Sequence, residues 1–561
     1  MAVSLRAKPF YLTEEEEAFL EKTKEGMTEE EKIGQLFFPI GYTADPGYLD
    51  HAILNKHPGG LMFRTGDPAE IAGAYNYVQK ASKIPMFTAA NLEAGGDGIA
   101  AGGTAYGKQM QVAAAGGPKY ARELGEVCAR EGKAVGCNFA FAPVVDIDLN
   151  WRNPITNVRT YGSDPETVLV CAREYIRACR ENGILTSIKH FPGDGTDERD
   201  QHILTSVNSL DREAWNASYG MIYRTLIEEG AEAVMVGHIA LPAYQKEDRM
   251  LPATLSGELV TGLLRGELGF NGLVITDATP MVGFCAAMER RLAVPKAIMA
   301  GCDMFLFNKD YDEDFRFMKE ALQSGLLTRE RIDEAVTRIL ATKIRLGLFG
   351  RDLTVTEEGF AVIGCEKHRK MAEECADRAV TLVKDEEKIL PVTAEKHRRV
   401  LLQVLGGCAS DERVMRTFAE ELEKRGHTVI PYEKEVFDFT KPLPFDSAES
   451  FRKKYDLVIY VGNVENASNK TVNRISWYTL FGLGNNLPWF VKEVPTLFVS
   501  LQNPYHLFDV PMIGTYVNAY SNHDAMIRAV AAKLHGESPF TGISPVDPFC
   551  GNNYLRGLTE A

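Results

Sequence analysis

Eight short apolar runs recur between residues 36 and 307, and their spacing constrains the fold more than any other feature of the chain. Stretches of helical length separate the runs, as expected where strands alternate with helices. The runs lie at residues 36–40, 59–63, 85–90, 138–143, 186–190, 233–238, 272–277 and 303–307. Eight such units in about 300 residues indicate an α/β fold, a TIM-like (β/α)8 barrel. An open, doubly wound sheet is the alternative, because counting strands cannot show closure.

Polar residues follow the predicted strands at the points where the strands end. In a parallel barrel these carboxyl ends meet on one face, and that face carries the active site. The strand-end residues are Arg64, Asn91, Glu93, Asp146, Asp148, Lys189, His190, His238, Asp277, Asn308 and Lys309. Single members have plainer explanations, since His238 could be a core histidine and Glu93 or Asp148 could cap the next helix. Their recurrence on strand after strand nevertheless predicts a functional face.

The segment from Ile184 to His202, ILTSIKHFPGDGTDERDQH, concentrates titratable groups. Its apolar strand ends in Lys189 and His190, and a loop broken by proline and glycine follows. The loop carries Asp194, Asp197, Glu198, Arg199, Asp200 and His202. A solvated acidic loop is the plain alternative, but the Lys-His pair and the closing Asp-x-His favour an active-site loop.

A second series of strand-like runs predicts a smaller α/β layered domain after the barrel. These runs lie at residues 379–383, 400–404, 428–432, 457–461, 496–501 and 514–519. We expect a helical lead-in at 1–29, the catalytic barrel at 30–350, a linker at 351–375 and the C-terminal α/β domain at 376–561. No Walker loop and no G-x-G-x-x-G after a strand occur in this domain, which disfavours a nucleotide role.

Charge and cysteine usage narrow the classes of partner. The net charge of -15 and the pI near 5.4 disfavour nucleic acid and anionic membranes as partners, because the overall field repels polyanions. No long apolar run predicts a membrane span, and the N-terminus has no apolar signal region. The ten cysteines are scattered singly, without metal-ligand spacing. We therefore expect reduced thiols, a cytoplasmic location, no metal and no cofactor.

The seventh run, GFNGLVITDATPM at residues 269–281, places Asp277 at a strand end, a position typical of a nucleophile or general base. Together with the KHFPGDGTDERDQH loop it resembles glycoside hydrolase family 3, in particular the two-domain type of its β-N-acetylglucosaminidase (β-N-acetylhexosaminidase) branch. That branch has a K-H-F-P-G-H-G loop closing with D-x-H, and a T-D-D or S-D-D strand end. Similar segments continue in the family order, including NPITNVRTYGSDP at 153–165 and ADRAVTLVKDEEKILPV at 376–392.

The resemblance implies a role for each matching residue. Asp277 would be the nucleophile and His202 the general acid/base, with Asp200 orienting the imidazole. The implied substrate-binding residues are Lys189, His190, Arg159, Glu93, Asn91 and His238. Three positions depart from the family pattern: Asp194 replaces a second histidine, NLEAGGDG at 91–98 replaces D-Q-E-G-G-R, and Ala278 replaces a second aspartate.

The chemistry of a retaining glycosidase agrees with these roles. One carboxylate attacks the anomeric carbon, and a second group protonates the leaving oxygen and then deprotonates water. An imidazole titrates near neutrality, so His202 could serve without a large pKa shift. Asp200, two residues away in an extended loop, is expected on the same side of the chain, where it would fix the tautomer. The glycines would let this dyad swing over the substrate.

The leading prediction is a retaining exo-β-N-acetylhexosaminidase that removes N-acetylglucosamine from small glycans or cell-wall fragments. Its partner is then a small-molecule carbohydrate substrate. A homodimer is the oligomeric state that this prediction allows. Phosphorolysis by the same residues and β-glucosidase activity are close alternatives. Other classes are a Schiff-base aldolase built on Lys189, a metal site at Asp194, Asp197, Asp200 and His202, and an inactive sugar-binding protein.

Overall fold

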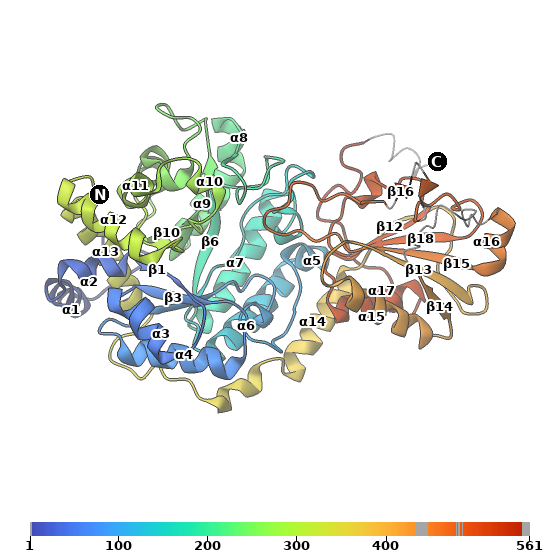
Figure 1. The fold of residues 1–561 in the computed structure, drawn as a ribbon, viewed down its shortest axis with the longest axis horizontal. Helices are drawn as coiled ribbons and strands as arrows, with labels where there is room; N and C mark the ends of the chain where they lie inside the picture. Colours follow the sequence, from blue (N-terminus) through green and yellow to red (C-terminus); the bar gives the residue numbers. More distant parts are fainter. Residues whose placement is uncertain (1–2, 433–446, 478, 481–482, 485, 553–561) are drawn as a thin grey trace. The chain divides into compact units, whose positions relative to one another are not determined.

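The computed structural model describes residues 3–432, 447–477, 479–480, 483–484 and 486–552 (Figure 1). The chain divides into two compact units. One comprises Met1–Tyr106 with Ala121–Arg369, and the other comprises Gly107–Tyr120 with Lys370–Ala561. Each unit is built around its own sheet.

The first unit contains every strand that the eight apolar runs predict, and all of these strands run parallel. They are β1 (Phe37–Phe38) with β2 (Ile40–Gly41), β3 (Gly60–Phe63), β4 (Phe87–Ala90), β5 (Phe139–Ala140), β6 (Leu185–Phe191), β8 (Ala233–Val236), β10 (Leu273–Thr276) and β11 (Phe305–Leu306). Seven form one continuous sheet in the order β10-β8-β6-β5-β4-β3-β2. The helices between them complete the α/β pattern.

Pairing at the edges of this sheet closes it into a barrel. β11 pairs with β1, with Phe37 opposite Phe305, and a parallel bridge joins Ile275 to Met304 just before β11. β1 leads directly into β2, which pairs with β3. Pro39 separates β1 from β2 because proline has no N–H to donate, although its carbonyl still accepts from Met62 N at 3.1 Å. The barrel is therefore confirmed, and the open sheet is excluded.

The helices of the barrel begin at residues that the sequence marks clearly. The main ones are α4 (Pro68–Ala81), α6 (Pro118–Ala134), α7 (Pro165–Glu181), α9 (Tyr219–Glu228), the helix Glu258–Glu267, α11 (Arg290–Ala300), α12 (Tyr311–Ser324) and α13 (Arg329–Arg345). Asp67 and Asp164 cap α4 and α7, each followed by proline in the first turn. Ahead of the barrel, α1 (Glu14–Glu25) begins with a capping box of Thr13 and Glu16.

The second unit is a six-stranded sheet in the order β12-β19-β18-β15-β13-β14. Its strands are β12 (Thr381–Asp385), β13 (Arg399–Leu405), β14 (Thr428–Pro431), β15 (Leu457–Gly462), β18 (Thr496–Ser500) and β19 (Thr515–Asn518), and only the β12–β19 pairing is antiparallel. Its helices include α14 (Glu366–Ala379), α15 (Asp411–Glu423), α16 (Ala448–Lys454) and α17 (Asp524–Leu534). All six runs predicted for this domain are strands.

The backbone N–H groups of the turn after β13 bind the side-chain carboxylate of Asp411. Asp411 accepts from Gly407 N at 2.6 Å, from Cys408 N at 3.2 Å and from Asn463 Nδ2 at 2.7 Å. In nucleotide-binding sheets, backbone N–H groups at such a turn bind phosphate. Here Asp411 occupies these donors, which agrees with the absence of a nucleotide motif in the sequence.

The compact units differ from the expected ranges in two places. Residues 107–120, expected in the barrel, belong to the second unit: Lys108 N donates to Ser521 Oγ, and Ile543 N donates to Ala114 O, each at 3.1 Å. The expected linker at 351–375 contains the start of α14, and the second unit begins again at Lys370. Among the described residues, no helix is long and apolar enough to cross a membrane.

Candidate active site

The carboxyl ends of the barrel strands bring the predicted residues to one face. Glu93 follows β4, and Lys189 and His190 lie near the carboxyl end of β6. His238 follows β8, and Asp277 follows β10. Because every barrel strand runs parallel, all of these side chains lie at the same end of the barrel. Sequence reasoning predicted this convergence.

Asp277 is held as a carboxylate among histidines. Its backbone N donates to Val236 O at 2.8 Å, and its Oδ1 accepts from Ala278 N at 2.7 Å. Burial opposes the charge, but nearby imidazoles, His190 foremost, and the hydrogen bond from Ala278 N outweigh it and lower the pKa of Asp277. The side chain remains 14% exposed. Asp277 is thus an ionised carboxylate that a substrate can reach.

His190 faces Asp277 in a fixed tautomer. Its Nδ1 lies 2.7 Å from Asp146 Oδ2, and its Nε2 lies 3.8 Å from Asp277 Oδ2. The carboxylate of Asp146 can only accept, so Nδ1 of His190 carries a proton and donates it in this hydrogen bond. Asp146 was among the strand-end residues but was not singled out as a site residue, because its partner lies 44 positions away in the sequence.

Glu93, Arg159 and Lys189 form a compact cluster of charges. Arg159 donates two hydrogen bonds to Glu93, from Nε at 3.0 Å and Nη2 at 2.8 Å, and Lys189 Nζ lies 2.6 Å from Glu93 Oε1. Burial alone would raise the pKa of Glu93, but the two cations hold it well below its ordinary value. This carboxylate is ionised and hydrogen-bonded, so it is suited to binding and not to proton transfer.

His202 and Asp200 form the predicted dyad, although not in an extended loop. The imidazole Nδ1 of His202 and its backbone N lie 2.7 Å and 2.9 Å from Asp200 Oδ1. The expectation of an extended chain is corrected, because Ile203 N donates to Asp200 O at 2.9 Å in a tight turn. Nδ1 of His202 is thus held by the buried carboxylate of Asp200, which fixes the orientation of the imidazole.

His238 is buried, and both of its ring nitrogens have partners. Nε2 lies 2.9 Å from Ala278 O and Nδ1 lies 3.0 Å from Thr254 Oγ1. A carbonyl can only accept, so Nε2 carries the proton and Nδ1 accepts from the hydroxyl. Burial lowers the pKa of His238 and favours this neutral form. The histidine therefore holds the carbonyl oxygen of Ala278, the residue that follows Asp277.

Two further predicted positions complete the face. Asn91 follows β4 (Phe87–Ala90) directly and is exposed. Asp194 is buried in the loop after β6, where its Oδ1 accepts from Asn153 Nδ2 at 3.1 Å and from Gly195 N at 2.7 Å. Burial and the nearby Asp146 carboxylate raise the pKa of Asp194 to about 7.

The contacts of Asp197, Asp200 and Lys189 disfavour the alternative metal and aldolase sites. Asp197 pairs with Arg199, with Nη2 at 2.8 Å from Oδ2, while Asp200 turns toward His202. Among the residues that the structure describes, no three histidine, cysteine, aspartate or glutamate side chains are arranged to hold a metal ion. Lys189 is 2% exposed and ion-paired with Glu93, an arrangement that does not favour attack on a carbonyl.

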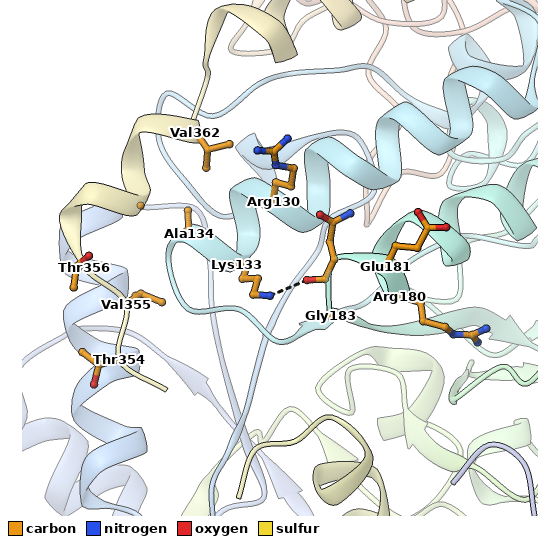
Figure 2. Close-up of a pocket in the computed structure, with 12 residues that line it drawn as sticks. Arg130, Lys133, Ala134, Arg180, Glu181, Gly183, Thr354, Val355, Thr356 and Val362 are labelled. Atoms are coloured by element: carbon orange, nitrogen blue, oxygen red, sulfur yellow. Dashed lines mark hydrogen bonds between the residues drawn. The ribbon is translucent and has the colours of Figure 1, made fainter. Parts of the chain in front are cut away.

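A surface cavity of about 710 Å³ lies at the other end of the barrel (Figure 2). It is lined by the last residues of α6 and α7, including Lys133 and Arg180, and by residues 354–356, Gly359 and Val362. The last residues of α6 and α7 immediately precede β5 and β6, so they mark the amino ends of the strands. This cavity is therefore remote from Asp277, and active sites of such barrels lie at the opposite face.

Comparison with known proteins gives a consistent result. A family model described as "Glycosyl hydrolase family 3 N terminal domain" matches residues 28–342. A Cellulomonas fimi protein named beta-N-acetylglucosaminidase/beta-glucosidase is 43% identical over 98% of this chain and 99% of its own. A solved structure named beta-glucoside phosphorylase BglX has a TM-score of 0.92 at 43% identity, covering 98% and 99% of the two chains. A family 3 β-N-acetylglucosaminidase from Paenibacillus sp. str. FPU-7 has a TM-score of 0.79 at 25% identity, covering 94% and 100%.

Proposed function

Since the chain belongs to glycoside hydrolase family 3, we propose that it is a retaining exo-β-N-acetylhexosaminidase acting on terminal β-linked N-acetylglucosamine. That it is a glycosidase with a carbohydrate substrate follows from the family. The observation that carries the finer proposal is the placement of an ionised Asp277 on the same barrel face as the His202–Asp200 dyad. The natural substrates would be small glycans or cell-wall fragments.

In this proposal Asp277 attacks the anomeric carbon and forms a covalent glycosyl-enzyme. The lowered pKa of Asp277 keeps the nucleophile charged, and His238 steadies the peptide that follows it through Ala278 O. A retaining mechanism needs a group on the other side of the bond to protonate the leaving oxygen. Nε2 of His202 supplies that proton and then removes one from water, while the Asp200 carboxylate stabilises the imidazolium.

The charged cluster beside the nucleophile supplies the sugar subsite. Lys189, Arg159 and Glu93 hold one another in place, so their remaining donors and acceptors are oriented before a sugar arrives. His190 Nε2, which is 3.8 Å from Asp277 Oδ2, is close enough to share a sugar hydroxyl with the nucleophile. Asn91 extends the same face. His238 acts on the nucleophile's peptide in this scheme and not on the sugar.

Phosphorolysis is the second candidate, and one observation favours it. The solved structure named beta-glucoside phosphorylase shares 43% identity with this chain along almost its full length. A neutral imidazole repels phosphate less than a carboxylate would, so a histidine acid/base lets phosphate attack the glycosyl-enzyme. The second step would then release a sugar 1-phosphate.

The deciding experiment is to incubate the protein with 4-nitrophenyl β-N-acetylglucosaminide, with and without phosphate, and to identify the sugar product. Free N-acetylglucosamine in both cases supports hydrolysis, and sugar 1-phosphate in the phosphate sample supports phosphorolysis. The matching β-glucoside tests the sugar, because the Cellulomonas fimi relative is named for both activities. Equal rates on the two glycosides would count against a preference for the N-acetyl group.

The proposed location is the cytoplasm. All ten cysteines are free thiols in the structure, and six of them are buried. Burial raises the pKa of Cys137, Cys171 and Cys302 to about 12, which keeps these thiols protonated and unreactive. Such cysteines behave as core residues of a protein that folds under reducing conditions.

A further inference from the structure

Gln201 lies between the two residues of the proposed dyad and is itself buried, at 1% exposure. Its side chain connects two strand ends. Oε1 accepts from His238 N at 2.8 Å, after β8, and Nε2 donates to Asp194 Oδ2 at 3.3 Å, in the loop after β6. A single amide thus ties the turn that carries Asp200 and His202 to two neighbouring strands of the barrel.

The orientation of this amide is determined by its surroundings. The backbone N–H of His238 can only donate, so it must face the amide oxygen of Gln201. The amide nitrogen is then directed at Asp194, which receives N–H groups from Asn153, Gly195 and Gln201. Asp194 must present acceptor oxygens to satisfy all three donors.

Asp194 is in turn attached to the groups around the nucleophile. Its backbone N donates to Asp146 Oδ1 at 2.8 Å, and the other oxygen of Asp146 holds His190, which faces Asp277. A continuous chain of hydrogen bonds therefore runs from the nucleophile side of the site to Gln201. Displacing Asp194 would disturb the acid/base turn before it disturbed Asp277.

The other side of the turn packs on α10 (Val282–Cys285) at a glycine. A Cβ at Gly283 would lie 2.5 Å from Gln201 O and 2.7 Å from Leu204 O, so only glycine permits this approach. Val282 N also donates to His202 O at 3.0 Å. The turn is thus held from β6, β8 and the segment after β10 together.

We propose that Asp194 and Gln201 form a clamp that positions the His202–Asp200 dyad for proton transfer to the leaving group. This inference rests on the function proposed above and deepens it. The clamp replaces the expectation of a freely swinging loop, and it gives Asp194, which departs from the family pattern, a defined task. Neither residue needs to touch the substrate, so both are positioning residues.

Two single substitutions and the double variant that combines them test the clamp. In Asp194→Asn the new amide nitrogen meets the nitrogen of Gln201, and in Gln201→Glu two carboxylates face each other, so each single change breaks the contact. In the double variant the new amide donates to the new carboxylate, whose other oxygen still accepts from His238 N. The contact is restored with its polarity reversed, and the recovery measures the coupling.

The readout is kcat/KM for the methyl and the 4-nitrophenyl β-N-acetylglucosaminides, measured at pH 8. Methanol needs a proton to leave and nitrophenolate does not, so a misplaced acid slows the methyl glycoside selectively. Each single variant should lower the methyl-to-nitrophenyl ratio by about 10- to 100-fold, and the double variant should return it to within about threefold of the wild type. The defect of Gln201→Glu should shrink below neutral pH, where the two carboxyls share a proton.

Arg199→Lys is the matched control, because it changes an exposed residue of the same loop and keeps the pairing with Asp197. Its ratio should equal that of the wild type. Equal losses on both glycosides in the single variants, without recovery in the double variant, would overturn the clamp. Thermal unfolding identifies a variant that fails to fold, in which case the other single variant and the double variant decide. The proposed function fails separately if His202→Ala slows both glycosides equally.

Discussion

Asp277 and His202 differ in how deeply their side chains are buried. Asp277 is buried, and its pKa is lowered because nearby imidazoles, His190 foremost, and the N–H of Ala278 outweigh the cost of burial. The side chain of His202 is more exposed than that of its partner: 21% of it is exposed, while the side chain of Asp200 is fully buried. In the proposed mechanism Asp277 would act as a charged nucleophile in a buried position and His202 as a proton carrier in a more exposed one, as the two steps of a retaining reaction require.

Replacing Asp277 with Asn should lower turnover by about 10⁴–10⁶-fold with little change in fold, because the amide keeps the shape and loses the charge. The nucleophile itself can be identified with an activated fluorosugar, which should label Asp277 in the wild-type protein. Mass spectrometry of the labelled peptide gives the position. A label on Glu93 or Asp148 would contradict the assignment.

Replacing His202 with Ala should separate the two half-reactions. Nitrophenyl substrates should still glycosylate Asp277, whereas alkyl or sugar aglycones should lose about 10²–10⁴-fold, because only these need a proton to leave. Deglycosylation still needs a base, so a burst should appear in rapid-mixing experiments. Azide needs no deprotonation and should restore turnover as a β-glycosyl azide. A uniform loss on all aglycones, with no effect of azide, would make His202 a binding residue.

At the scale of elements, the closure of the barrel depends on a buried carboxylate beside β11. Asp303 is fully enclosed and meets three arginines: Arg265 Nη2 at 2.7 Å, Arg331 Nη2 at 2.8 Å and Arg338 Nη1 at 3.5 Å. Its Oδ2 also accepts from Val274 N at 2.9 Å, in β10. One side chain therefore joins two strands to α13 and to the helix at 258–267.

Asp303→Asn should destabilise the protein by about 3–5 kcal/mol, because it leaves buried guanidinium groups without their counter-charge. Urea unfolding at pH 7 measures this, and Glu334→Gln, at the exposed edge of the same cluster, should cost far less. Burial opposes the charge of Asp303, but the arginines lower its pKa in the folded protein. Its contribution is thus complete above the unfolded pKa of about 4 and is lost as the pH falls toward the folded value. Equal unfolding midpoints for Asp303→Asn and wild type at pH 7 would refute this.

The elements were predictable from the sequence to the extent that they depend on local pattern. Short apolar runs bounded by glycine and proline predicted every barrel strand, and the strand-end rule predicted Asp277 and Lys189. Closure was not predictable, because it rests on Phe37 pairing with Phe305, far apart in the chain. The positioning role of Gln201 was not predicted for a similar reason, since it depends on a contact with His238 N, 37 residues away. The turn at Asp200 was missed because a side-chain oxygen, and not an apolar pattern, stabilises it.

At the scale of the whole molecule, the chain enters the second unit before the first unit is complete. It leaves the barrel unit at Tyr106, contributes residues 107–120 to the second unit, and returns at Ala121. Within this segment α5 (Gln109–Ala114) buries Met110 and Val112 completely. The partners of α5 come from the C-terminal part of the chain, such as His523, whose Nε2 lies 3.1 Å from Gln111 Oε1.

A chain shortened to residues 1–369 should therefore be less soluble than the barrel fold alone would suggest. It keeps α5 but loses the rest of the second unit, so we expect Met110 and Val112 to become exposed to water, at about 1.5–3 kcal/mol for each fully buried side chain. Exposed apolar surface of this kind promotes association. Size-exclusion chromatography should show oligomers or aggregates, and a fluorescent apolar dye should bind.

The matched control is the same shortened chain with Met110→Gln and Val112→Thr, which removes the apolar face of α5 and leaves the barrel strands unchanged. This control should elute as a smaller, better-defined species and bind less dye, because the defect is assigned to α5 and not to the barrel. In the full-length protein the same two substitutions should have the opposite effect and lower stability, since there the two side chains are fully buried. A shortened chain that is monomeric without the substitutions, and that does not bind the dye, would show that residues 107–120 can pack without the rest of the second unit.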